Sequence, residues 1–265
     1  MTLTYSGAPG TGRAVALVTG VSRAKGIGAA TARLLAAAGV DVLATGWQAY
    51  DELADTERSP HDVEHLLAEI ELAGGRAAWM PLDLTDPDTF PGLFAEAQAR
   101  FGPVSILINN AAFSLRDGWS ALTAELLDDH YNVNIRGTAL LTTEFARRWP
   151  GGTGGRVINL TSGQFKGPML DEIAYVATKG AIDAMTITLS AELAPLGITV
   201  NAVGPGPTDT GWMSPELEAE LLPKFPFGRI GQPEDVARLI AFFASDQAEW
   251  ITGQIIHSEG GFLRR

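Results

Sequence analysis

Tyr175 and Lys179 are the side chains of this sequence best suited to move a proton, because they stand four positions apart. In a helix this spacing places both on one face, with Cβ atoms about 5–6 Å apart. A nearby ammonium favours the phenolate, lowers the pKa of the tyrosine and so improves the hydroxyl as a proton donor or acceptor near neutral pH. Ser162, at the end of an apolar run upstream, could hold a carbonyl oxygen meanwhile. The competing interpretation is an ordinary surface pair whose lysine stem lies along the helix.

A glycine-rich turn, residues 20–28, lies between an apolar run at 14–19 and an Ala/Leu-rich segment at 29–38. This order predicts a buried strand, a turn and a helix. Bare glycines let the backbone approach a pyrophosphate, and the N-terminus of the helix supplies N–H donors and the positive end of a dipole. Arg23 and Lys25 lie inside the turn, where the phosphates would be. The arrangement indicates a dinucleotide site.

The end of the second expected strand bears on the choice of dinucleotide. Many NAD-binding units carry an acid there, which bonds the ribose hydroxyls of the adenosine. Here the strand at 41–45 ends in Gly46 and Trp47, with no carboxylate. The missing acid, together with Arg23 and Lys25, favours NADP(H), and NAD(H) stays possible.

Seven short apolar segments alternate with helical ones along the chain, without repeats. The pattern predicts an α/β fold, a single doubly wound Rossmann domain with a seven-stranded parallel sheet and helices on both faces. Ligands of such sheets bind beyond the carboxyl ends of the strands, which is where the chemically suggestive residues fall. The expected strands are residues 14–19, 41–45, 77–82, 105–108, 156–160, 199–203 and 253–257.

Several further boundaries follow from composition. Residues 1–12 are small and polar and predict a disordered N-terminal lead before a domain at 13–265. Long helices are expected at 125–149 and 173–196, and another helix should start with Ser59 as N-cap and Pro60 as its first residue. Residues 211–228, rich in Trp, Met, Phe and Pro, suit a mobile substrate lid, although core or subunit interface is an equal alternative.

Composition excludes several classes of function. The chain has no cysteine, so it forms no disulfide, zinc–thiolate site or thiol nucleophile. Its formal charge of −12 disfavours nucleic acid and anionic membrane as partners. No apolar stretch is long enough to span a bilayer, and no signal peptide is recognisable. We therefore expect a cytoplasmic protein that acts on a small molecule.

The segment around His61, Glu64 and His65 is the strongest rival motif, because His-x-x-Glu-His is the zinc-binding pattern of one metallopeptidase class. Two histidines four apart could hold zinc while the glutamate serves as base. The alternative is a solvated, charged helix face. No third ligand stands out downstream, so we expect no metal.

From Val15 to Phe262 the chain resembles the short-chain dehydrogenase/reductase family, most broadly its 3-oxoacyl-acyl-carrier-protein reductases. The resemblance rests on the glycine turn, the Asn109-Asn110-Ala111 segment, Asn134, Ser162, Tyr175 with Lys179, Pro205-Gly206 and Thr210. It implies that Tyr175 is the general acid/base, that Ser162 polarises the carbonyl or hydroxyl oxygen, and that Lys179 lowers the Tyr175 pKa and bonds the nicotinamide ribose. Asn134 would position a water that links Lys179 to solvent.

The resemblance also implies a cofactor set and a substrate pocket. The cofactor residues would be Gly20, Ser22, Arg23, Lys25, Gly26, Ile27, Gly28, Asp83, Leu84, Asn110, Ala111, Tyr175, Lys179, Pro205, Gly206, Thr208 and Thr210. Asp83 could instead be an ordinary turn or cap residue. The substrate would be a medium-sized, partly apolar ketone or secondary alcohol, with a 3-oxoacyl thioester as one candidate. Its pocket would be formed by Phe113, Gln164, Phe165, Met169, Trp212 and Met213.

One departure from the family concerns the turn, because five residues separate Gly20 from Gly26 and family members usually have fewer. The longer loop is similar to that of related enoyl reductases, but those space their Tyr and Lys further apart. The spacing of Tyr175 and Lys179 therefore favours carbonyl chemistry over double-bond reduction.

The resemblance further implies a homo-oligomer, a dimer or tetramer, assembled through the long helices and the C-terminal segment. An acidic carrier protein could be received only by local cations such as Arg147 and Arg148. A second class of function is a catalytically silent, nucleotide-sensing regulatory protein on the same fold. The intact set of Asn134, Ser162, Tyr175 and Lys179 favours the NADP-dependent oxidoreductase.

Overall fold

A computed structural model of the chain describes residues 2–53 and 59–264. All seven predicted strands are present, each within two residues of its expected bounds. The strands are β1 Val15–Thr19, β2 Asp41–Gly46, β3 Arg76–Pro81, β4 Ile106–Asn109, β5 Gly155–Leu160, β6 Ile198–Pro205 and β7 Ile255–Ser258. They form one sheet in the order β3-β2-β1-β4-β5-β6-β7, and the registered neighbours are all parallel. The predicted fold class is confirmed.

The inner strands are apolar because helices cover the sheet on both faces. Every residue of β1, β2, β4 and β5 is buried, as expected for strands of a parallel sheet. The helices are α1 Ile27–Ala37, α2 Gln48–Leu53, α3 Asp62–Leu72, α4 Phe90–Arg100, α5 Ala124–His130, α6 Thr138–Arg148, α7 Ile173–Leu193, α8 Pro215–Leu221 and α9 Pro233–Ala244. Shorter helical turns are η1 Pro87–Thr89, η2 Tyr131–Gly137, η3 Ala194–Leu196, η4 Leu222–Lys224 and η5 Asp246–Ala248.

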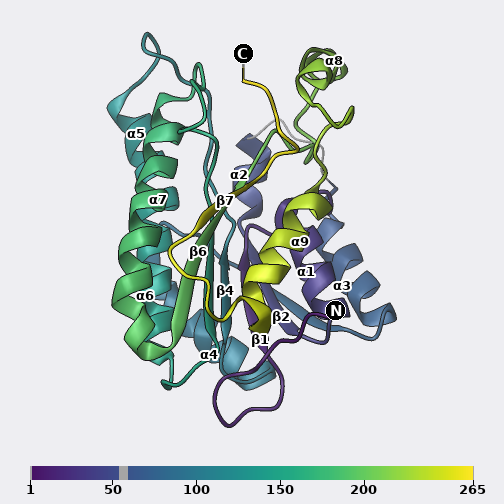
Figure 1. The fold of residues 1–265 in the computed structure, drawn as a ribbon, viewed down its shortest axis with the longest axis vertical. Coiled ribbons are helices and arrows are strands. Elements are labelled where there is room, and N and C mark those ends of the chain that lie inside the picture. The colour runs from purple at the N-terminus through teal and green to yellow at the C-terminus, as the bar shows by residue number, and fades with distance from the viewer. Residues whose placement is uncertain (1, 54–58, 265) are drawn as a thin grey trace.

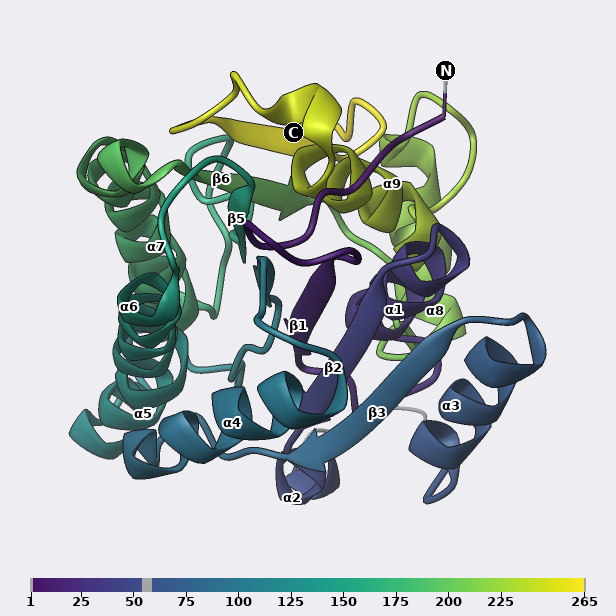
Figure 2. The same cartoon turned by 90° about the horizontal axis from the view of Figure 1, so that it is seen from below.

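Two hydrophobic cores lie on opposite faces of the sheet. One joins the strands to α1, α3 and α9 through residues such as Leu35, Leu66 and Ile240. The other joins them to α4, α6 and α7. Figure 2 shows the two groups of helices on either side of the sheet. Since the strand order reverses direction between β1 and β4, a crevice opens beyond their carboxyl ends, the usual ligand position in such folds.

The upper end of the molecule in Figure 1 holds α8 and the C-terminus. Here Leu221, Phe225 and Ile230 form a small separate core, against which Met213 and Phe262 pack. The aromatic rings of Phe225 and Phe262 lie 4.9 Å apart, centroid to centroid. These contacts give the expected lid a packing partner in the C-terminal segment, and its mobility stays a prediction.

The helix expected over 125–149 is present as one continuous helical segment, residues 124–148. Its middle, η2, is π-helical and joins α5 to α6 without leaving helical backbone geometry. A Cβ added to Gly137, the last residue of η2, would lie 2.7 Å from the carbonyl oxygen of Leu84. The helix therefore approaches the neighbouring loop too closely for a side chain at this point. Single π turns of this kind often occur at functional sites, and this one contains Asn134.

Two expected helix and terminus boundaries are wrong. Residues 2–12 are not a loose lead: the backbone N–H of Ser6 donates to the Asp246 carboxylate at 3.0 Å, and Ala8 is 1% exposed. The apolar side chains of Leu3 and Tyr5, which pack against the first core, account for this docking. Likewise α3 begins at Asp62 and not at Pro60, because Ser59 and Pro60 form a turn before it. Part of the preceding acidic segment, residues 54–58, lies outside the described residues.

Within the described ranges, no helix is both long and apolar enough to cross a membrane.

Candidate active site

The glycine turn after β1 is held against the end of β4. Gly20 has a φ of +73°, and a Cβ there would lie 2.7 Å from the side-chain nitrogen of Asn110. That nitrogen donates to the carbonyl oxygens of Thr19 and Gly20 at 2.8 and 3.1 Å. Asn110 therefore fixes the turn, and glycine is required for both its conformation and its close approach.

The N-terminus of α1 offers free backbone donors. Gly26 is its N-cap, no side chain caps it, and its first turn holds no acidic residue. The first N–H groups of the helix consequently lack intrahelical partners, and the dipole favours an anion there. A Cβ on Gly28 would lie 2.7 Å from both Asn110 and the Gly20 carbonyl oxygen. This crowded, donor-rich turn fits a pyrophosphate.

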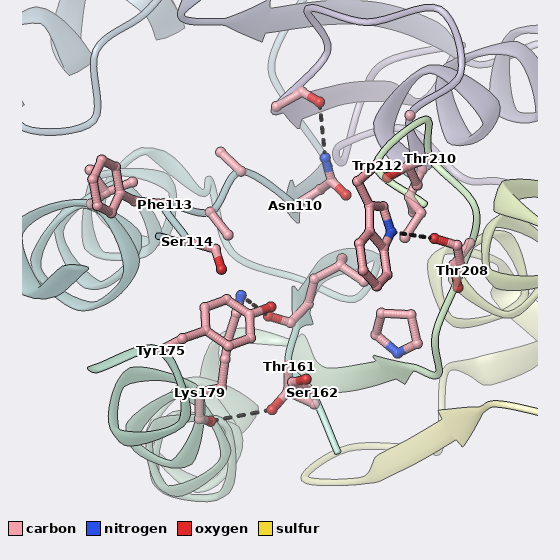
Figure 3. A pocket seen from close by; sticks show the side chains of 18 of the residues that line it. Asn110, Phe113, Ser114, Thr161, Ser162, Tyr175, Lys179, Thr208, Thr210 and Trp212 are labelled. Atoms are coloured by element: carbon pink, nitrogen blue, oxygen red, sulfur yellow. Dashed lines mark hydrogen bonds between the residues drawn. The ribbon is translucent and has the colours of Figure 1, made fainter. Parts of the chain in front are cut away.

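A cavity of about 620 Å³ runs from this turn to Tyr175. Figure 3 shows Tyr175 and Lys179 facing it from α7, with Thr208, Thr210 and Trp212 on the opposite wall. The predicted residues that line it are Gly20, Ser22, Arg23, Gly26, Ile27, Asp83, Leu84, Asn110, Ala111, Phe113, Ser162, Met169, Tyr175, Lys179, Pro205, Gly206, Thr208, Thr210 and Trp212. Its size and its lining are suited to a dinucleotide together with a small organic molecule.

Lys179 is buried beside Tyr175 on the first two turns of α7. Its Nζ donates to the carbonyl oxygen of Leu160 at 2.8 Å and lies 5.5 Å from the centre of the Tyr175 ring. Burial lowers the pKa of Lys179 to about 8, although the charge of Asp183 acts in the other direction. The predicted helical pairing of phenol and ammonium is thus present.

The predicted effect of this pairing on Tyr175 is wrong for the chain alone. Burial raises the pKa of the Tyr175 phenol, the charge of Glu172 adds to the rise, and a hydrogen bond with Ser162 opposes it. The expectation rested on one charge pair taken in isolation. In the folded protein, loss of water from the phenol outweighs the nearby ammonium, so Tyr175 keeps its proton at neutral pH.

Ser162 lies two residues after the end of β5 and faces the cavity. Its hydroxyl donates to the sulfur of Met169 at 3.7 Å, a weak contact that a better acceptor could replace. The preceding Thr161 anchors β5 to α7, since its hydroxyl donates to the carbonyl oxygen of Lys179 at 3.2 Å. The strand thereby fixes Ser162 relative to Tyr175 and Lys179.

Asn134 is 1% exposed and does not line the cavity. Its oxygen accepts from the Phe113 N–H at 2.7 Å, and its nitrogen donates to the Phe113 carbonyl oxygen at 2.9 Å and to the Thr178 hydroxyl at 3.0 Å. Both donors of the amide are therefore occupied by protein atoms. Asn134 holds the loop after β4 against α7, and its expected link to a water stays a prediction.

Other expected site residues point elsewhere. Lys25 forms an ion pair with Asp209 at 2.9 Å and Gly28 lies behind the turn, so neither lines the cavity. Gln164 turns inward and donates to Thr161 at 3.1 Å and also to Asp183. Phe165 is 75% exposed to solvent. Met213 packs in the small core of the lid region.

Several cavity residues come from parts of the chain without a recognisable motif. Tyr50, in α2, bonds through its hydroxyl to the Ser114 N–H at 3.0 Å and packs on Phe113 at 5.3 Å. The remaining unpredicted lining residues include Trp47, Arg116, Leu170, Glu172, Phe262 and Arg264. They lie in loops or near a terminus, where no periodicity indicates the direction of a side chain. Only the position of Trp47 after β2 gave a signal in the sequence.

The zinc motif lies away from this cavity. The rings of His61 and His65 are 6.1 Å apart on the exposed side of α3, with Glu64 also exposed. Among the residues that the structure describes, no group of three His, Cys, Asp or Glu side chains could hold a metal ion. The solvated helix face is therefore the better interpretation of this segment.

Known proteins are similar to the chain over nearly its whole length. The family model described as Enoyl-(Acyl carrier protein) reductase matches residues 20–263. The uncharacterized oxidoreductase YjdA of Bacillus subtilis (strain 168) is 52% identical over 94% of this chain and 97% of its own. An NADPH-dependent aldehyde reductase-like protein, chloroplastic, of Arabidopsis thaliana is 36% identical over 94% of each chain. A solved short-chain dehydrogenase/reductase from Serratia marcescens BCRC 10948 has a TM-score of 0.82 at 31% identity, covering 94% of this chain and 97% of that one.

Proposed function

The chain belongs to the short-chain dehydrogenase/reductase family, and we propose that it transfers a hydride between NADP(H) and a carbonyl or secondary alcohol. One observation carries this proposal. A single cavity joins the donor-rich glycine turn to Ser162, Tyr175 and Lys179, so that a dinucleotide in the turn and a substrate beside the phenol would share one space. When bound, the nicotinamide supplies or accepts the hydride.

The residues of the chain supply position and the proton. Tyr175, which holds its proton at neutral pH because burial raises its pKa, donates that proton to the carbonyl oxygen. Ser162 gives up its weak contact with Met169 and donates to the same oxygen. Lys179, fixed by Leu160, provides a positive charge that stabilises negative charge developing on the oxygen and the phenol. In its protonated state Tyr175 can act as the acid that carbonyl reduction requires.

Three features support NADP(H) over NAD(H). The strand β2 ends at Gly46 without a carboxylate that would repel a 2′-phosphate. Arg23 lines the cavity at the glycine turn, with its guanidinium donating to the Thr210 carbonyl oxygen at 3.2 Å. The Arabidopsis relative is named NADPH-dependent. Lys25 supports this preference less than the sequence suggests, because it does not line the cavity and pairs with Asp209 at 2.9 Å.

The spacing of Tyr175 and Lys179 supports carbonyl reduction, whereas the matching family model is described as an enoyl reductase. A nucleotide-sensing regulatory protein would have no use for the phenol of Tyr175 and the ammonium of Lys179 inside the fold. Placing both in the interior costs free energy that a simple binding protein could avoid with apolar residues.

Tyr175→Phe tests the proposal, with Tyr131→Phe as the matched control because Tyr131 is 49% exposed outside the cavity. In a panel of ketones and 3-oxoacyl thioesters, the wild type and the control should consume NADPH, and Tyr175→Phe should lose at least about 100-fold in kcat, the usual range for a proton donor. Fluorescence titration should give nearly equal NADPH affinity for all three proteins and weaker binding of NADH. Full turnover by Tyr175→Phe would refute the assignment of Tyr175 as proton donor. Tighter binding of NADH than of NADPH would overturn the cofactor preference.

A further inference from the structure

The N-terminus of α7, which carries Tyr175, is capped by a residue from a different loop. The carboxylate of Asp117 accepts from the N–H groups of Ile173 and Ala174, both at 2.7 Å, and also from Gly118. Burial alone would raise the pKa of Asp117, but these three bonds hold it below its usual value. Asp117 therefore caps α7, a role that normally belongs to the side chain at the N-cap position.

Glu172 occupies that N-cap position and makes no capping bond. Within the described chain its carboxylate has neither a hydrogen bond nor an ion pair, and it lines the cavity beside Tyr175. It lies near enough to the phenol to raise the Tyr175 pKa. Burial raises the pKa of Glu172 itself, although Arg116 opposes this. The carboxylate is only half-buried and makes no capping bond, so Glu172 has no structural task that explains it.

The backbone before Glu172 is strained. Asp171 has a φ of 60°, in the left-handed region that side chains rarely adopt. Its carbonyl oxygen accepts from the Asp117 N–H at 2.9 Å, and its carboxylate comes so close to Gly118 that a Cβ there would lie 2.8 Å away. The contacts with Asp117 and Gly118 thus fix the backbone conformation of Asp171, which in turn positions Glu172. Strain of this kind persists where the surroundings enforce it, often at ligand sites.

The charges around Glu172 indicate which ligand group it would accept. Arg116 lines the same cavity and its charge lowers the pKa of Glu172, whereas the charges of Asp117 and Asp171 raise it. Arg264, another cavity residue, is already paired with Glu259. Asp117 is occupied by three N–H donors and Asp171 does not line the cavity, so an ammonium group beside Glu172 would also meet the repulsion of Arg116. A neutral hydroxyl needs only an acceptor, which Glu172 provides.

We propose that Glu172 is a specificity-determining residue that accepts a hydrogen bond from a hydroxyl group next to the carbonyl, so that the preferred substrates are α-hydroxy ketones or the corresponding vicinal diols. This inference rests on the proposed carbonyl reductase activity. It adds to that activity the chemical class of the substrate, through a residue that takes no part in proton transfer.

The test uses three matched ketones: acetophenone, 2-hydroxyacetophenone and 2-aminoacetophenone. Their common phenyl ring suits a cavity with aromatic lining residues such as Phe113 and Trp212. The kcat/KM for NADPH-dependent reduction is measured for the wild type, Glu172→Gln and Glu172→Leu. Glu192→Leu, an exposed substitution at the far end of α7, is the control. Circular dichroism of each variant monitors folding, and Glu172→Gln retains the shape if the leucine variant unfolds.

The wild type and the control should prefer the hydroxy ketone to acetophenone by at least about tenfold, as expected for a hydrogen bond to a charged group. Glu172→Leu should abolish that ratio and Glu172→Gln should reduce it. Because loss of the charge also lowers the Tyr175 pKa, the ratio of the two ketones at one pH is the quantity compared. An unchanged ratio, or an equal fall for both ketones, would overturn the proposal while leaving the reductase activity intact. A preference for the amino ketone would overturn the choice of a neutral donor. Wild type without activity on any ketone would instead overturn the proposed function and the inference with it.

Discussion

Replacing Lys179 by methionine should change how the stability of the protein depends on pH. The side chain is 3% exposed, and burial lowers its pKa from 10.5 to about 8. Between these two values the unfolded chain binds more protons at this position than the folded chain does. The free energy of unfolding of the wild type therefore rises with pH across this window. The destabilisation is fully present below about pH 8 and is relieved toward pH 10.5.

The size of this effect on stability follows from the pKa shift of Lys179. A change from 10.5 to about 8 corresponds to about 3 kcal/mol of stability withheld at neutral pH. Methionine removes this titration, but it also removes the bond from Nζ to the Leu160 carbonyl oxygen, which costs about 1–3 kcal/mol at every pH. We expect the two proteins to be nearly equal in stability at pH 7, and the wild type to gain about 3 kcal/mol on the variant by pH 10.5.

Urea unfolding followed by circular dichroism at pH 7, 8, 9, 10 and 10.5 measures this difference. Tyr175, whose pKa is raised, titrates in both proteins and so largely cancels from the comparison. The constant cost of the lost hydrogen bond cancels as well, because only the change with pH is compared. A gap in stability that stays constant from pH 7 to 10.5, or that moves in favour of the variant, would refute the reasoning.

Two further substitutions test the site and its surroundings. Gly28→Ala would bring a Cβ within 2.7 Å of Asn110 and of the Gly20 carbonyl oxygen, so NADPH affinity measured by fluorescence titration should fall at least about tenfold; unchanged affinity would show that the turn is not the phosphate site. Asp235, whose pKa Arg229 lowers to about 2, accepts from the Gln232 N–H at 2.9 Å in the capping box of α9. Because its folded pKa is depressed, its stabilisation is present above about pH 4 and is lost as the pH falls toward 2, so Asp235→Ala should cost about 1 kcal/mol at pH 7 and little at pH 2 in urea unfolding. An equal cost at both pH values would contradict the role of the charge.

The sheet could be predicted from the sequence because strands buried on both faces leave long apolar runs, as β1, β2, β4 and β5 do. The π-helical geometry at η2 could not be predicted, since it accompanies the approach of Gly137 to Leu84, two residues far apart in the chain. The docking of residues 2–12 depends in the same way on contacts with Asp246 and Gln247. Both features arise where tertiary contacts override local preference.

Predictions for the residues of the site also depend on where each residue lies in the chain. Residues one or two positions after a strand, such as Asn110 and Ser162, lie where the sequence predicts, because the strand fixes their position and direction. Side chains further along the loops do not lie where the sequence predicts. Gln164 and Phe165 were expected in the cavity, but Gln164 finds buried partners in Thr161 and Asp183, and Phe165 faces solvent. In a loop, the direction of a side chain depends on the partners that the rest of the fold offers.

The same dependence gives Glu172 its significance. In the sequence, an acidic residue directly before a helix has an obvious purpose as a cap for the first turn. That purpose disappears once Asp117 has taken both N–H groups from another loop. The carboxylate of Glu172 is then left facing the cavity, where it can accept a hydrogen bond from a ligand. Asp117 thus caps the N-terminus of α7 in place of Glu172, and the carboxylate of Glu172 becomes available for a substrate.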